Sequence, residues 1–315
     1  MPRDLSRVFL REASVGAVVW IGLWLGSFLP GTHYGIIEIL LLLAPWVVVP
    51  LAASLLTQRK TSRQLLIASW MVPPAAALVT ASFFVARSLL AACLASGWVL
   101  VCLIFVWDAF SRLWISKGRS FIEFCFATGE GYLLVAALWL VASRAGLHPF
   151  GFQEPIVLLT AVHFHFAGFA SALLAGLTYE KLRDSAWARV LSVASVGVVC
   201  GPGILGLAFL AGPKCKLAAA LLIAVSQFGL AAGLFRVGLA TRPSGRLLLG
   251  VAGGSVLLGM VLAAAWAIGE YPLQPFVDLR QMAEFHGVLN ALGFAVCGLL
   301  GWTQLKVEGR DAPSG

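Results

Sequence analysis

Long apolar segments separated by short polar ones make up almost the whole chain. Since a helix needs roughly 20 apolar residues to cross a bilayer, this pattern predicts ten membrane-spanning helices. They are expected near residues 13–30, 35–56, 64–85, 88–109, 121–143, 155–178, 187–211, 215–236, 246–268 and 280–302. The apolar runs are continuous rather than alternating, which favours helices over the strands of a membrane barrel. We therefore predict an all-α, polytopic membrane helix bundle that forms a single integral membrane domain over residues 1–315.

The positive charges support this number of spans, because they fall in alternate loops. Seventeen of the 22 Lys and Arg residues lie on one predicted side of the membrane. The other five are Arg87, Arg144, Lys214, Lys216 and Arg280. Lys and Arg accumulate in cytoplasmic loops, so both termini are expected in the cytoplasm. The first apolar run has no small-x-small cleavage site at its end, and we interpret it as a retained spanning helix.

The composition excludes a water-soluble fold. The chain is 60% hydrophobic and 11% charged, with a mean hydropathy of +0.93, whereas soluble domains average about 25% charged residues. The net charge of +8 does not indicate nucleic-acid binding, because the basic residues follow the loops instead of forming one basic face. The expected partners are the lipid bilayer and a small or lipophilic molecule. The six cysteines show no metal-type spacing, and all except Cys215 lie inside apolar runs, so small core residues are the favoured interpretation.

Two predicted spans contain helix breakers near their centres. Pro73 and Pro74 lie in the third span, and Gly201, Pro202 and Gly203 lie in the seventh. Because proline removes a backbone donor, both helices are expected to kink or unwind there. Broken helices present carbonyl groups to substrates in transporters, and a packing kink is the alternative.

Ionisable and strongly polar side chains inside the predicted spans are the main candidates for chemistry, since a charged one costs about 2.5–3.5 kcal/mol to insert. They are His163 and His165 in the sixth span, Glu284, His286 and Asn290 in the tenth, and Glu130 in the fifth. Glu38 and Glu123 lie nearer the ends of their spans and are expected to extend to the membrane interface.

The spacing of these residues constrains how they act together. Residues two apart on a helix point about 200° apart, so His163 and His165 are expected to serve different neighbours. His286 and Asn290 are four apart and share a face, beside small residues that let another helix approach closely. The sixth span also has many small residues. We predict that it packs against the tenth and brings the three histidines together.

These residue types can bind a cofactor or move protons. A neutral imidazole ligates a transition metal ion or haem, or carries a proton, and a nearby carboxylate acts as ligand or base. The predicted roles are metal ligation by His163, His165 and His286, a cofactor contact by Asn290, and catalysis by Glu130 and Glu284. The alternative is structural, with each imidazole donating a hydrogen bond to a backbone carbonyl.

Two segments resemble the signature stretches of the bacterial YndJ-like membrane protein family. They are Thr160-Ala-Val-His-Phe-His-Phe-Ala-Gly-Phe169 and Glu284-Phe-His-Gly-Val-Leu-Asn-Ala-Leu-Gly-Phe294. The resemblance implies a multi-pass protein of the bacterial cytoplasmic (inner) membrane, and it singles out His163, His165, Glu284, His286 and Asn290. It implies no particular reaction.

The His-Phe-His motif is also similar to the helix of haem-copper oxidase catalytic subunits in which two histidines ligate two different haems from opposite faces. Those subunits need further histidines on several helices, including an adjacent pair, and this chain has only five histidines in all. Membership of that class is excluded, whereas binding of one haem or one metal ion remains open.

Three hypotheses follow from the sequence. The first is a membrane-embedded metal or haem protein, including a redox or isomerising enzyme that acts on a lipophilic substrate. The second is a proton-coupled transporter in which Glu130 and the histidines carry the proton and the third and seventh spans gate. The third is a structural or assembly protein that uses its histidines only for packing.

Overall fold

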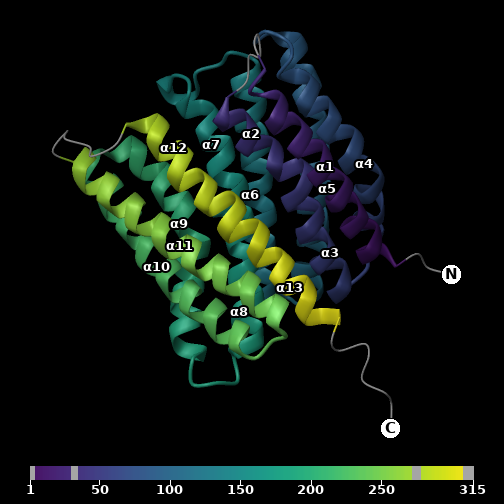
Figure 1. Ribbon diagram of the computed structural model, residues 1–315, viewed down its shortest axis with the longest axis vertical. Helices are drawn as coiled ribbons and strands as arrows, with labels where there is room; N and C mark the ends of the chain where they lie inside the picture. Colours follow the sequence, from purple (N-terminus) through teal and green to yellow (C-terminus); the bar gives the residue numbers. More distant parts are fainter. Residues whose placement is uncertain (1–3, 30–34, 272–277, 308–315) are drawn as a thin grey trace. The chain divides into compact units, whose positions relative to one another are not determined.

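The computed structural model of the protein describes residues 4–29, 35–271 and 278–307. Within these ranges every regular element is helical, and ten helices are long and apolar enough to cross a membrane (Figure 1). The predicted all-α fold with about ten spans is therefore confirmed. The side of the membrane on which the termini lie stays a prediction from the loop charges.

The chain forms two compact units, Met1–Phe169 and Ala170–Gly315. The first unit contains α1 (Leu5–Gly26), α2 (Ile36–Leu43), η1 (Ala44–Val48), α3 (Val49–Arg59), α4 (Arg63–Ser82), α5 (Leu89–Ile115), α6 (Phe121–Arg144), η2 (Pro149–Gly151), α7 (Ile156–His163) and nearly all of η3 (Phe164–Ala170). The second contains α8 (Ser171–Leu182), α9 (Ala188–Ala211), α10 (Pro213–Leu239), α11 (Pro243–Glu270), α12 (Leu279–Val288), η4 (Leu289–Val296) and α13 (Cys297–Val307). The single domain expected over residues 1–315 stays a prediction.

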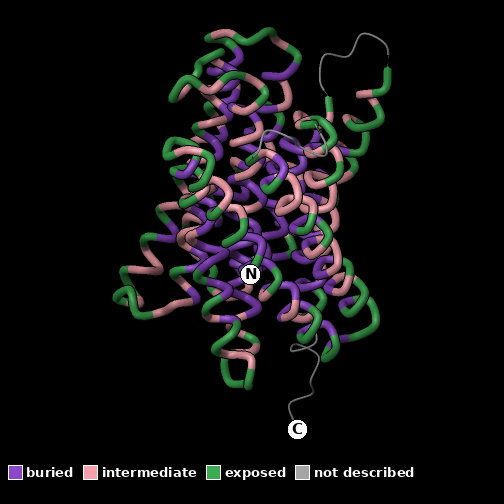
Figure 2. Tube along the Cα trace, turned by 90° about the vertical axis from the view of Figure 1, so that its left-hand side faces the viewer, coloured by how far each residue is buried: buried purple, intermediate pink, exposed green. Residues whose placement is uncertain are grey.

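Most spanning helices have a packed face and an exposed face, and both are apolar, whereas the span Ile36–Arg59 is almost entirely buried. In α5 the buried positions include Ala91, Ala95, Trp98 and Cys102, which repeat every three or four residues as one helix face does. Trp107 on the other face is 59% exposed. Buried and exposed positions interchange within single turns along the helical traces of Figure 2. An apolar exposed face suits a helix that borders lipid.

Side-chain caps fix where several of these helices begin. Ser62, Ser88 and Ser120 each accept a hydrogen bond from the backbone N–H three residues later, at the start of α4, α5 and α6. Asp278 accepts one from Gln281 N–H at 2.7 Å before α12. Such caps satisfy N–H groups that a helix cannot bond internally, so short polar loops are enough to start the spans.

In the described part of the chain, three spans are interrupted by π-helical segments, namely η1, η3 and η4. In η3 the His165 ring nitrogen Nδ1 lies 2.8 Å from the Ala161 carbonyl oxygen. In η4 the Asn290 Nδ2 donates to the His286 carbonyl oxygen at 2.7 Å. Each carbonyl is the α-helical partner of the backbone N–H four residues later. Because the side chain competes for that carbonyl, the turn widens locally.

The prolines of the third and seventh spans do not unwind their helices. Both α4, with Pro73 and Pro74, and α9, with Pro202, are α-helical along their whole length. The predicted unwinding is therefore not observed. In a membrane bundle the carbonyls that proline frees can be satisfied by neighbours and small local adjustments, which lets the helix continue.

In the first unit, α1 approaches the backbone of η1 very closely. A Cβ on Gly16 would collide with the carbonyl oxygen of Trp46. Trp46 is four residues before Pro50, which has no N–H to offer this carbonyl. The Trp20 indole Nε1 donates to the Ile39 carbonyl oxygen at 2.8 Å, and the Trp46 indole donates to Thr80 Oγ1 at 2.9 Å. These contacts hold α1, α2, η1 and α4 together.

Candidate functional site

The first unit contains a group of charged side chains that we call the Arg112 cluster. Its members are Asp108 and Arg112 of α5, Glu123 and Glu130 of α6, and Arg59 at the end of α3. The Arg112 guanidinium pairs with Asp108 and Glu130, and its Nε lies 2.9 Å from Glu123 Oε2. The Arg59 Nη2 lies 3.3 Å from Glu123 Oε1. The Arg112 guanidinium therefore joins three carboxylates, and Glu123 links Arg59 to this group, so that five charged groups from three helices are connected.

Helical spacing explains why these side chains meet. Asp108 and Arg112 are four residues apart on α5, and Glu123 and Glu130 are seven apart on α6, so each pair lies on one helix face. The two helices pack side by side in the first unit (Figure 1). Both faces turn toward the seam, since Asp108 and Glu130 are among the buried residues of their helices.

Burial makes this cluster electrostatically unusual. The side chains of Glu130, Asp108 and Arg112 are 0%, 2% and 11% exposed, and a buried charge must be compensated by close partners. The cluster has three carboxylates and two guanidinium groups, so one negative charge is left over when all are ionised. A proton on one carboxylate would remove that excess charge.

Glu130 is the carboxylate best placed to take this proton. Its Oε2 accepts a hydrogen bond from Arg112. Its Oε1 is buried and has no hydrogen-bond partner among the described residues. A buried, charged carboxylate oxygen without a hydrogen-bond donor costs free energy. A proton on Oε1 would neutralise the carboxylate, so that this oxygen no longer carries a share of the negative charge. Glu130 was predicted as a catalytic carboxylate, and that role stays a prediction.

His165 lies in η3 with both ring nitrogens in hydrogen bonds. Its Nδ1 lies 2.8 Å from the Ala161 carbonyl oxygen, so Nδ1 carries the proton. Its Nε2 accepts from the indole Nε1 of Trp98 on α5 at 3.0 Å. A metal ion at His165 would have to displace Trp98, because the lone pair that ligates a metal is already shared.

His163 has different surroundings from His165. It is the last residue of α7 and is half-buried, and its ring lies edge-on to Phe164 with the centroids 5.9 Å apart. A spacing of two residues led us to expect different neighbours for these two imidazoles. Metal ligation by either one stays a prediction.

In the second unit, His286 and Asn290 form a small polar site against Gly259 of α11. The His286 Nδ1 lies 2.8 Å from the Gly259 carbonyl oxygen, and Asn290 donates to the His286 carbonyl. A Cβ on Gly259 would collide with the Asn290 amide. With the proton on Nδ1, the His286 Nε2 keeps its lone pair and lies 3.5 Å from Asn290 Nδ2. Donation to a carbonyl fixes the tautomer, as it does in metal-binding histidines, and it is also the contact that the structural alternative predicts.

Glu284 does not take part in the polar contacts of His286. Its Oε1 lies 2.9 Å from Arg280 Nε, and both side chains are exposed, at 38% and 83%. This pair is an i, i+4 ion pair on the outside of α12. The predicted catalytic role of Glu284 stays a prediction.

The expected meeting of the three histidines also stays a prediction. His163 and His165 belong to the first unit and His286 belongs to the second. Within the described part of the chain, no three His, Cys, Asp or Glu side chains are grouped closely enough to hold a metal ion.

Several residues of these sites were missed from the sequence. Asp108 lies at the end of an apolar run, and Arg112 was interpreted only as a topology signal. Their i, i+4 spacing opposite two glutamates was the available clue. Trp98 gave no signal, because its role depends on a distant histidine. Glu123 was expected to reach the interface, but it is held by Arg59 and Arg112 instead.

Comparisons with known proteins identify similar sequences but no similar solved structure. The model of the family described as YndJ-like protein matches residues 39–294. A Bacillus subtilis (strain 168) protein named "uncharacterized membrane protein YndJ" is 25% identical over 207 residues, which is 65% of this chain. The match covers 37% of that relative, so the chain spans a little over a third of its length. No solved structure matches.

Proposed function

We propose a function for this chain, which belongs to the YndJ-like protein family. In this proposal it is a proton-coupled transporter of the bacterial cytoplasmic membrane, and Glu130 carries the proton. The observation that supports this proposal is the Glu130 carboxylate, which is fully buried, bonded to Arg112 through one oxygen and unpartnered at the other within the described structure. Ionisable groups inside membrane spans commonly belong to proton or ion pathways.

The Arg112 cluster can convert a proton into a change of packing. When Glu130 is ionised, Arg112 is shared among three carboxylates. When a proton sits on Glu130 Oε1, the attraction of Glu130 for Arg112 weakens, and Arg112 stays with Asp108 and Glu123. Because Arg112 belongs to α5 and Glu130 to α6, the proton acts on the seam between two spans. Such a local charge change can bias a two-state element.

His286 is the second proton-accepting group in this proposal. Its Nδ1 is tied to the Gly259 carbonyl, so a proton would arrive at Nε2. The charge would then be carried beside Asn290, which itself bonds the His286 carbonyl. A histidine whose Nδ1 is held by a carbonyl and whose Nε2 has only a long 3.5 Å contact with Asn290 Nδ2 is suited to proton transfer.

The proton-binding step is tested in proteoliposomes adsorbed on a solid-supported membrane. A rapid pH jump is expected to displace charge in the unmodified protein and to produce little or no displacement in Glu130→Gln. Glu284→Gln is the matched control, because it removes a carboxylate from an exposed ion pair. Equal charge displacement in Glu130→Gln and the unmodified protein would overturn the proposal.

The transport step is tested by labelling Cys200, which is half-buried in α9 two residues before Pro202. In a variant that keeps only Cys200, an impermeant maleimide should reach it from opposite sides at high and low pH. A variant that keeps only the exposed Cys215 should label from one side throughout. If Cys200 is labelled from the same side at high and low pH, the result contradicts alternating access.

A second candidate is a metal ion or haem site, with a lipophilic substrate, and one observation favours it. The Gly259 carbonyl fixes the His286 tautomer and leaves Nε2 as a ligand atom. The other candidate ligands from the sequence are His163, Glu284 and Asn290, and His165 would have to give up its hydrogen bond from Trp98. Elemental analysis and visible absorption of purified protein should then show near-stoichiometric metal or haem that His286→Ala loses and His148→Ala keeps. Metal-free, colourless protein would exclude this function.

A further inference from the structure

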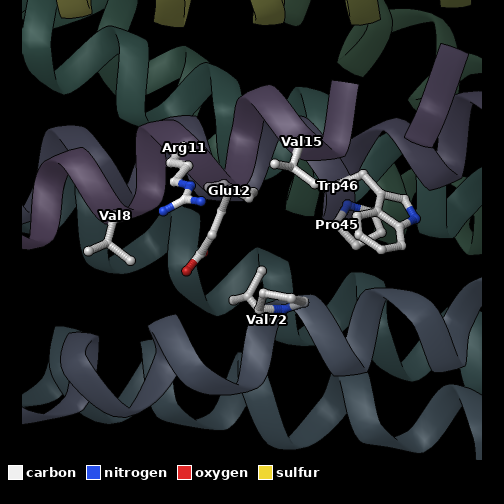
Figure 3. A pocket seen from close by; sticks show the side chains of 9 residues that line it. Val8, Arg11, Glu12, Val15, Pro45, Trp46 and Val72 are labelled. Atoms are coloured by element: carbon white, nitrogen blue, oxygen red, sulfur yellow. The ribbon is translucent and has the colours of Figure 1, made fainter. Parts of the chain in front are cut away.

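A pocket in the first unit opens between α1, η1, the start of α3 and α4 and has a volume of about 190 Å³. Its walls are almost entirely apolar and are built mainly by Val8, Val15, Pro45, Pro50, Val72 and Pro73. Two charged residues of α1, Arg11 and Glu12, also line it. Figure 3 shows Glu12 extending from α1 toward Val72 of α4, with Arg11 beside it. Neither residue belongs to the Arg112 cluster.

Glu12 places a negative group inside this apolar pocket. Its Oε2 is buried and has no hydrogen-bond partner in the described part of the chain. A buried carboxylate oxygen without a donor costs free energy, so a ligand that donates a hydrogen bond and carries a positive charge would be stabilised there. Arg11 is exposed and can hold an anionic group at the mouth of the pocket.

The surroundings of the pocket point to a lipid rather than a soluble ligand. The α1 face at and beyond the pocket is apolar and exposed: Val15, in the pocket wall, is 55% exposed and Val18 is 71% exposed. On α4, Trp70 is 68% exposed. Glu12 lies seven residues after the start of α1, or about 10 Å along the helix. This places the carboxylate near the level where a spanning helix leaves the hydrocarbon.

We propose that this pocket binds the headgroup of an amine-bearing phospholipid, with a primary ammonium donating to Glu12 and the phosphate against Arg11. A primary ammonium offers three N–H donors to the carboxylate. A quaternary ammonium such as choline offers none and is bulkier. The apolar walls accommodate the carbon atoms that follow the headgroup. The neighbouring Arg11 and Glu12 thus match the two opposite charges of a phosphoethanolamine group.

Native mass spectrometry of the delipidated full-length protein tests this assignment. Phosphatidylethanolamine and phosphatidylcholine with the same acyl chains are added in parallel. The unmodified protein should bind the ethanolamine lipid at least about tenfold more tightly, as expected for a charge-assisted hydrogen bond in a buried site. Stepwise N-methylation of the headgroup should weaken binding progressively. Equal affinity for all headgroups would overturn the proposal.

Two variants localise the effect to the pocket. Glu12→Gln, which keeps the size of the side chain, should lose the preference for the ethanolamine headgroup. Arg7→Gln should keep it, because Arg7 lies one turn earlier, is 81% exposed and pairs with Asp4. Retention of the preference in Glu12→Gln would contradict the assignment. Soluble phosphoethanolamine should not displace the lipid at equal concentration, and displacement would identify a soluble amine as the ligand instead.

Discussion

Individual buried polar residues carry most of what is specific about this protein. The burial of Glu130 and His165 could be expected from the sequence, because a Glu or His inside an apolar run stands out. Their partners could not, because Trp98 and His165 are 67 residues apart in the chain. The hydrogen bond between them joins two helices that no local pattern connects.

The contribution of Trp98 and His165 can be measured with a double-mutant cycle. His165→Leu leaves the buried Trp98 N–H without an acceptor and should cost about 1–3 kcal/mol of unfolding free energy. In Trp98→Phe the same His165→Leu change should cost less, with a coupling energy of about 0.5–3 kcal/mol. Unfolding in mixed detergent micelles measures all four proteins. Strictly additive losses would mean that the hydrogen bond contributes nothing.

Substitution of Arg112 should lower the free energy of unfolding much more than substitution of an exposed arginine. Arg112→Gln leaves buried carboxylates without their cation, and we expect a loss of about 3–5 kcal/mol. Arg280→Gln removes the same charge from an exposed pair and should change stability by less than about 1 kcal/mol. Thermal unfolding in detergent compares the two variants. A similar effect of both substitutions would contradict a buried, coupled cluster.

At the scale of elements, the apolar pattern predicted where the spans lie better than how they are built. The predicted spans 121–143 and 187–211 correspond to α6 (Phe121–Arg144) and α9 (Ala188–Ala211). The first helix begins at Leu5, whereas residue 13 was predicted. The predicted start was too late because charged residues in the first turns of this helix interrupt the apolar run. The irregular segments proved to be π-helical, at His165, at Asn290 and around two prolines of the second span. A side chain that competes for a carbonyl leaves no mark on hydropathy.

Because α1 approaches η1 closely at one glycine, we expect replacement of that glycine to destabilise the protein and replacement of another glycine of α1 to have little effect. Gly16→Leu must push α1 away from the Trp46 backbone, and overpacking of this kind typically costs about 1–3 kcal/mol. The same substitution at Gly22 should be tolerated, since nothing lies within 4 Å of a Cβ there. Unfolding in detergent, together with retention of the ethanolamine lipid, measures both variants. Equal behaviour of the two would argue against this packing.

At the scale of the whole molecule, the family predicted from two short segments is confirmed by a match over residues 39–294.

The loop charges predict which loops face the cytoplasm, and cysteine labelling in intact cells can test this orientation. In variants with one cysteine, the exposed Cys215 should react with an impermeant maleimide from outside. Ser185→Cys, in the exposed loop between α8 and α9, should react only after permeabilisation. The reverse pattern would invert the topology.

The central claim is that Glu130 takes up a proton inside the membrane, and infrared difference spectroscopy of the reconstituted protein tests it most directly. On acidification, the unmodified protein and Glu284→Gln should both gain the carbonyl band of a protonated carboxyl in an apolar environment, whereas Glu130→Gln should lack it. If the band persists unchanged in Glu130→Gln, Glu130 is not the group that binds the proton.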